Sequence, residues 1–148
     1  MNRLNRNVEY ALIALNYMEG CNPGQLFSVK QLAEHMNAPF DSLSRVMQKL
    51  VKQKLIQSEQ GKSGGYRLAC DFSETSLYDL IKTIQGPVEI VKCLGTSDDC
   101  VMESNCDLKS PVTFLNSKLI EFYKTISIQE LLSQNTGYKN NSMEVFAQ

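Results

Sequence analysis

The sequence predicts one mainly helical domain with a small β-hairpin. Apolar residues recur at helical spacing in several segments, most clearly over residues 41–54. Capping patterns typical of helix starts occur at Ser28 and Ser76. A glycine-rich stretch, GKSGG at 61–65, separates two short segments with strand-like composition. With 148 residues, the chain can form one domain with a real core but not two independent ones.

The first part of the chain predicts three helices. The first helix is expected over 5–19, ending before Gly20. Ser28 is expected to cap a short helix over 28–36, and Asp41 to cap the next helix over 41–54. The last of these carries one apolar stripe at positions i, i+3, i+4, i+7 and i+8, formed by Leu43, Val46, Met47, Leu50 and Val51. Two short helices joined by a tight turn are typical of a helix-turn-helix, although any two-helix piece of a globular protein has a similar pattern.

A predicted hairpin follows directly, with strand-like residues at 55–56 and 66–68. Its glycines, Gly64 and Gly65, allow the backbone to turn and to approach a phosphate closely. Residues 41–67 contain six basic and two acidic residues, a local charge of +4 in a chain of net charge −1. This order of elements is the layout of a winged helix and favours DNA binding over a plain hairpin that only closes the core.

The second part of the chain predicts further helices around a cysteine-rich loop. Ser76 is expected to start a helix that ends at Gly86-Pro87, and the polar loop 93–106 follows. Ser110-Pro111 predicts the start of a long helix with an apolar stripe, which is expected either to form a dimer or to pack in the core of a monomer. A last short helix is expected to 132. Residues 1–70 then form the DNA-binding unit, 71–134 the cysteine loop and dimerisation helices of the same domain, and 135–148 a disordered tail.

The loop 93–106 contains three of the five cysteines and has no apolar periodicity. The amino terminus shows neither a signal peptide nor a membrane span, so we expect a cytoplasmic protein without a membrane partner. In a reducing compartment, clustered cysteines more often bind metal or sense redox state than form structural disulfides. An enzyme with a small-molecule substrate is not expected, since no histidine accompanies a cysteine and no phosphate-binding loop precedes a helix.

Together, LNRNVEYAL at 4–12, the helix-turn-helix, GKSGGYRL at 61–68, the three cysteines and the long helix resemble the Rrf-two-type winged-helix regulators. The resemblance covers residues 1–133. It implies a homodimeric bacterial transcription regulator that binds a palindromic operator in double-stranded DNA. Many members of this family hold an iron–sulfur cluster near the dimer interface, and others contain none.

The resemblance also implies a set of metal ligands. By position, Cys93, Cys100 and Cys106 match the cluster-binding cysteines, although the first interval is one residue longer than is usual. IscR-like members add a histidine where this chain has Lys109, so that ligand set is absent. NsrR-like and RsrR-like members use a carboxylate from the partner's first helix, and Glu9 occupies that position. Three cysteines without histidine favour a [4Fe–4S] over a [2Fe–2S] cluster.

The predicted DNA contacts come from the second helix of the helix-turn-helix and from the wing. Residues at the start of that helix are expected to face the base edges of the major groove, and basic or polar residues further along it and on the wing to contact phosphate or the minor groove. The candidates are Asp41, Ser42, Ser44, Arg45, Lys49, Gln60, Lys62 and Arg67. Family members often have arginine in place of Gln60, so operator preference is expected to differ.

Cluster loss or modification, by redox change or nitric oxide, is expected to alter operator affinity. Two alternatives use the same thiols without an iron–sulfur cluster. One is a sensor in which they form reversible disulfides. The other is a structural zinc site.

Overall fold

The computed structural model describes residues 4–69, 72–91, 94 and 106–134. Cys93 and Cys100, most of the predicted cysteine loop and the predicted disordered tail lie outside the described residues.

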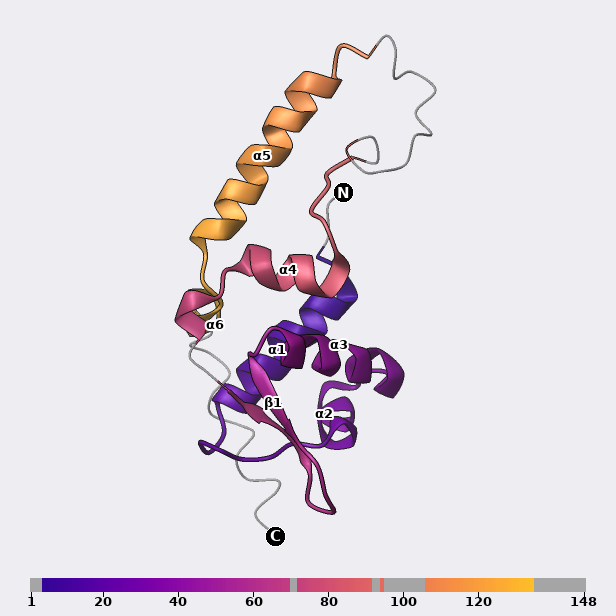
Figure 1. Ribbon diagram of the computed structural model, residues 1–148, viewed down its shortest axis with the longest axis vertical. Coiled ribbons are helices and arrows are strands. Elements are labelled where there is room, and N and C mark those ends of the chain that lie inside the picture. Colours follow the sequence, from indigo (N-terminus) through magenta and orange to yellow (C-terminus); the bar gives the residue numbers. More distant parts are fainter. Residues whose placement is uncertain (1–3, 70–71, 92–93, 95–105, 135–148) are drawn as a thin grey trace.

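The described chain is mainly helical with one two-stranded antiparallel hairpin, which confirms the predicted fold class. The helices α1–α3, the hairpin and α4 form one body, and α5 extends away from it (Figure 1). The elements are α1 (Arg6–Glu19), α2 (Val29–Met36), α3 (Phe40–Lys52), β1 (Ile56–Glu59), β2 (Gly65–Leu68), the 3-10 helix η1 (Phe72–Glu74), α4 (Leu77–Gln85), α5 (Lys109–Thr125) and α6 (Ile128–Ser133).

Helix starts follow the capping patterns of the sequence. The Ser28 hydroxyl accepts a hydrogen bond from the Gln31 amide, and the Gln31 side chain accepts one from the Ser28 amide. Ser76 and Asp79 form the same reciprocal pair at α4. Each pair satisfies two amides that would otherwise lack partners at the helix end, so both predicted capping boxes are confirmed.

The start of α3 differs from the prediction by two residues. Pro39, rather than Asp41, is the N-cap, and its carbonyl accepts the amide of Leu43 at 3.0 Å. Proline is suited to this position because its fixed φ, here −61°, leaves the chain ready to begin a helix. The helix therefore begins at Phe40, and Asp41 lies in its first turn.

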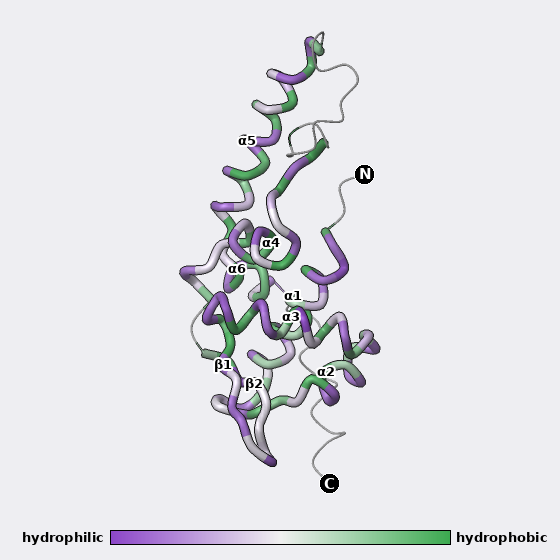
Figure 2. The backbone as a smooth tube through the Cα atoms, turned by 45° about the vertical axis from the view of Figure 1, so that its right-hand side comes forward, coloured by the Kyte–Doolittle hydropathy of each residue, from purple (hydrophilic) through white to green (hydrophobic). Residues whose placement is uncertain are grey.

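The hydrophobic core lies between α1, α3 and α4. Four residues of the predicted α3 stripe are buried, namely Leu43, Val46, Met47 and Leu50, whereas Val51 is only half-buried. In contrast, α5 has no buried residue, although apolar and polar residues alternate along it (Figure 2). Of the predicted apolar stripe, Leu115 and Phe122 are exposed in the single chain, whereas Val112, Leu119 and Ile126 are half-buried.

The hairpin is fixed to the loop that precedes α2. Gln57 pairs with Arg67 across the two strands, and a further bridge joins Phe27 to Tyr66 through two backbone hydrogen bonds of 2.8 Å. A β-carbon on Gly65 would lie 2.7 Å from the Phe27 carbonyl oxygen. Glycine is thus needed at 65 for packing within the protein, a reason that the sequence prediction of phosphate approach did not include.

Candidate functional site

One side of α3 is free of the core and carries polar side chains. Because Leu43, Val46, Met47 and Leu50 face inward, the opposite side presents Asp41, Arg45, Gln48 and Lys52, all exposed. We call these four residues the outer face of α3. The predicted contacts Ser42 and Ser44 lie at its borders and are half-buried. Four of the predicted DNA-contact residues therefore lie together on the first two turns of α3.

Lys49 lies elsewhere. Its ammonium group donates a hydrogen bond of 2.5 Å to the carbonyl of Ile84, in the last turn of α4. A lysine at a helix C-terminus interacts favourably with the partial negative charge of the unpaired carbonyls there. Gln53, one turn further along α3, also bonds to α4, through the carbonyl of Asp79 and the hydroxyl of Thr83. Lys49 therefore joins α3 to α4 rather than extending the outer face.

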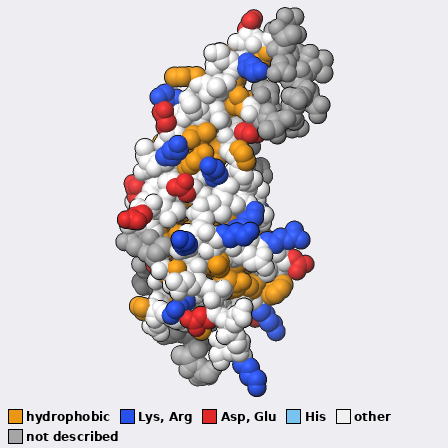
Figure 3. Space-filling model, viewed as in Figure 1, with side chains coloured by type: hydrophobic (Ala, Val, Ile, Leu, Met, Phe, Trp, Pro, Cys, Tyr) orange, Lys and Arg blue, Asp and Glu red, His pale blue; other side chains and the backbone are white. Residues whose placement is uncertain are grey.

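The wing carries the remaining predicted contacts. Gln60 and Lys62 are exposed at the turn between β1 and β2. Arg67 forms an ion pair of 3.1 Å with Glu59 and a hydrogen bond to Gln57, both on the opposite strand. Figure 3 shows basic side chains over α3 and at the far end of the wing, on one face of the molecule. The charge and the shape of this face suit a polyanion.

Three exposed residues of α3 were not among the sequence candidates. Gln48 and Lys52 could have been found from periodicity alone, because both are opposite the apolar stripe. Phe40 was missed because the helix was expected to begin only after its cap at Asp41; it is 54% exposed.

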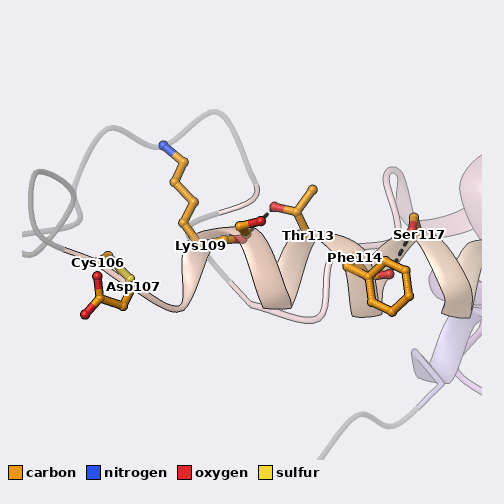
Figure 4. Close-up of a pocket in the computed structure, with 7 residues that line it drawn as sticks. Cys106, Asp107, Lys109, Thr113, Phe114 and Ser117 are labelled. Atoms are coloured by element: carbon orange, nitrogen blue, oxygen red, sulfur yellow. Dashed lines mark hydrogen bonds between the residues drawn. The ribbon is translucent and has the colours of Figure 1, made fainter.

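Cys106 is the one predicted thiolate ligand among the described residues. It is half-buried and lies three residues before the start of α5. An open cavity of about 680 Å³ extends from Cys106 along the first turns of α5 to Phe114 and Ser117 (Figure 4). The hydroxyls of Thr113 and Ser117 on its wall donate to carbonyls of their own helix, at 2.7 Å in each case. The thiol of Cys106 is the softest donor on this wall.

We call residues 88–106 the cysteine segment. The described residues at both ends of this segment are attached to α5. One end is Cys106 itself. At the other, the Asn116 side chain accepts the amide of Ile90 and donates to the carbonyl of Val88, each at 3.1 Å. The chain that leaves α4 therefore runs beside α5 (Figure 1).

Glu9 lies in the first turn of α1 and is half-buried. Its carboxylate forms a 2.8 Å ion pair with Arg6, which raises the pKa of the Arg6 guanidinium. The start of α5 points away from the body that contains α1 (Figures 1 and 2), and no cluster of three metal-binding side chains occurs among the described residues. Within one chain, the described structure does not bring Glu9 and Cys106 together.

His35 and Cys21, two further potential metal-binding side chains, are not among the residues that line this cavity. His35, which is exposed on α2, stacks on Tyr17, with ring centroids 4.0 Å apart. Cys21 is half-buried in the turn after α1, and burial raises the pKa of its thiol.

Comparison with known proteins identifies the family. The family model described as "Rrf2: Iron-dependent Transcriptional regulator" matches residues 4–134. The chain belongs to the Rrf2 family. This Rrf2 protein is therefore a DNA-binding transcription regulator and not an enzyme, as the sequence predicted. No helix in the described part of the chain is both long and apolar enough to cross a membrane.

Three similar proteins illustrate the range of the Rrf2 family. The chain is 25% identical to the transcriptional regulator NsrR of Shouchella clausii over 131 residues, 88% of each chain. It is 30% identical to IscR of Vibrio vulnificus over 104 residues, 70% of this chain and 61% of that protein. The solved structure of CymR, the global cysteine regulator of B. subtilis, superposes with a TM-score of 0.65 at 19% identity, covering 90% of this chain and 98% of CymR.

Proposed function

We propose that this Rrf2 protein is a homodimeric regulator whose operator affinity is controlled by an iron–sulfur cluster. Cys93, Cys100 and Cys106 would bind the cluster, with the partner subunit's Glu9 as the fourth ligand. The observation that carries the proposal is that both described ends of the cysteine segment are attached to α5, beside an open cavity that Cys106 lines. The "iron-dependent" description of the family and the similarity to NsrR and IscR support it.

The donors present fit an iron–sulfur group. Thiolates are soft ligands that suit iron. A [4Fe–4S] cluster is favoured over a [2Fe–2S] cluster because three cysteines without a histidine resemble the ligand set of NsrR-like members. When bound, the cluster would supply a group that oxidants or nitric oxide can modify. A carboxylate binds iron more weakly than a thiolate does, so a cluster with Glu9 as a ligand would be more readily lost.

On cluster binding, the Glu9 carboxylate would leave its ion pair with Arg6 and bind iron of the cluster instead. Its ion pair with Arg6 is on the surface, with the Glu9 side chain 39% exposed, so giving it up costs little. Since Glu9 and Cys106 lie apart within one chain, the carboxylate would approach across the dimer interface. Cluster binding would then connect α1 of one subunit to α5 of the other.

The dimer would form through α5. Leu108, just before α5, and Phe114, Leu115 and Phe122 within it are each more than half exposed, although all are large and apolar. Exposed apolar groups in such number on one helix are typical of an interaction surface. A two-fold dimer would present two outer faces of α3 to a palindromic operator.

On the DNA, the outer face of α3 would lie in the major groove. Asp41, Ser42, Ser44 and Arg45 would face base edges, with Gln48 added to this set because it lies on the same side. Gln60 and Lys62 at the wing tip would contact phosphate or the minor groove. Arg67 would act through its bonds to Glu59 and Gln57, which hold the wing in shape.

Anaerobic purification with iron and sulfide analysis tests the cluster. Wild type is expected to be brown and to contain iron and acid-labile sulfide, and Cys106→Ser to lose both. Cys21→Ser is the matched control, because Cys21 is a half-buried thiol outside the site, and it should retain the cluster. Operator affinity should change when the wild-type cluster is removed.

Other outcomes would identify the alternatives. A colourless sample with stoichiometric zinc would indicate a structural zinc site. A colourless, metal-free sample that forms reversible disulfides among the three cysteines would indicate a thiol sensor. Glu9→Ala should make the cluster less stable to a chelator, whereas Arg6→Ala should not; equal stability of Glu9→Ala and wild type would rule out the fourth-ligand proposal.

A further inference from the structure

Phe40 is an exposed aromatic residue at the start of α3, the helix whose outer face is polar. It is the first residue of α3, and 54% of its surface is accessible, whereas most of the apolar stripe of the same helix is buried. The other large exposed apolar residues in the described part of the chain lie before or in α1 and before or in α5. Phe40 is thus isolated from the α5 surface, and its exposure is not explained by packing within the chain.

The backbone fixes where this side chain lies. Pro39 caps α3, so the side chain of Phe40 lies at the N-terminal rim of the helix. Ser44 is four residues further on and is therefore its neighbour on the helix surface. In Figure 1, the start of α3 is on the opposite side of the body from α5, so a dimer formed through α5 leaves Phe40 uncovered.

The chemistry of DNA offers one partner for an apolar ring in this place. Residues at the start of a recognition helix are the ones that contact base edges in the major groove. The only apolar group on those edges is the C5 methyl of thymine, and phenylalanine is among the side chains that contact it. The charge of Arg45, in the second turn of α3, favours the approach of DNA over that of an apolar partner.

We infer that Phe40 reads a thymine methyl in each half of the operator. This inference rests on the proposed placement of α3 in the major groove and extends it from polar to apolar recognition. Phe40 then contributes to specificity through a single methyl group, which hydrogen-bonding residues of the same helix do not detect.

Replacement of thymine by deoxyuridine provides the test, because uracil pairs identically and lacks only the methyl group. The operator is first selected with wild-type protein from random duplexes, and each thymine of one half-site is then replaced in turn. At one position, wild type should bind the uracil duplex about fourfold more weakly, the value expected for one buried methyl group. Phe40→Ala should bind thymine and uracil duplexes equally at that position, and Phe40→Leu should retain part of the preference.

Lys62→Ala is the control variant, since loss of a phosphate contact should weaken both duplexes by the same factor. Phe40→Ala should fold normally, because the side chain contributes little to the core, and its circular dichroism and melting temperature check this. Two outcomes would overturn the inference about Phe40 and leave the proposed operator recognition intact. One is a selected operator without thymine in the half-site, and the other is that every replacement weakens binding of wild type and of Phe40→Ala by the same factor. Selection that returns no preferred duplex would overturn the proposed operator recognition as well.

Discussion

Asn116 provides the most direct test of how the cysteine segment is held. Its side chain makes two hydrogen bonds of 3.1 Å, to the amide of Ile90 and to the carbonyl of Val88, in a part-buried position. Asn116→Ala removes both. A hydrogen bond of this kind contributes about 1 kcal/mol net, and water can replace part of the loss, so we expect local stability to fall by about 1–2 kcal/mol.

Hydrogen exchange at the Ile90 amide measures this loss. A decrease of about 1–2 kcal/mol corresponds to exchange roughly 5- to 30-fold faster, because 1.4 kcal/mol is a factor of ten. If the segment positions ligands as proposed, Asn116→Ala should also release iron faster to a chelator.

Thr113→Val is the matched control for Asn116. The Thr113 hydroxyl bonds only to a carbonyl of its own helix, so its removal should leave exchange at Ile90 unchanged. If Ile90 exchanges at the wild-type rate in Asn116→Ala, the side chain does not hold the segment, and the argument that α5 positions both ends of it fails.

Three further predictions concern the wing, the link between α3 and α4, and the dimer. Gly65→Ala should lower the free energy of unfolding in urea by about 2–3 kcal/mol, because the new methyl would meet the Phe27 carbonyl at 2.7 Å and break the adjoining bridge. Lys49→Met should lower the free energy of unfolding by about 1–2 kcal/mol in the same assay, yet leave the salt dependence of operator binding unchanged. Lys62→Ala should instead reduce the slope of log affinity against log salt concentration by about one, the value for one phosphate contact. Phe122→Asp should weaken the dimer roughly 30-fold by light scattering or sedimentation.

Each of these predictions has an outcome that would contradict it. Gly20→Ala is the control for the wing, since Gly20 has φ −70° and its added methyl would make only ordinary contacts; if both glycine variants are equally stable, close packing does not explain Gly65. A reduced salt slope for Lys49→Met would restore Lys49 to the DNA contacts. A dimer unaffected by Phe122→Asp would place the interface elsewhere.

Local signals in the sequence predicted the helices because each depends on a few neighbouring residues. The capping boxes at Ser28 and Ser76 formed as expected, since the donor and the acceptor are three residues apart. The start of α3 was misplaced by two residues because proline and aspartate both favour helix starts, and Pro39 precedes Asp41 in the chain.

Features that depend on distant residues were not predictable in the same way. Lys49 is a basic residue of the kind that contacts DNA, but its ammonium group donates a hydrogen bond to the carbonyl of Ile84, 35 residues later in the chain. The role of Gly65 depends on Phe27, and that of Asn116 on the segment after α4. A single sequence does not show which side chains meet across such distances. The predicted ligands Cys93 and Cys100 lie outside the described residues.

The bridge between Phe27 and Tyr66 has a consequence for regulation. It fixes the wing to the loop before α2, and α2 in turn packs on α3, so the proposed DNA-contacting parts of one chain are joined to one another. In the proposed dimer, a signal that acts through α5 would change the distance and angle between two such units. A duplex that contains a single half-site should therefore bind equally well in both states of the regulator, and only the complete palindrome should distinguish them.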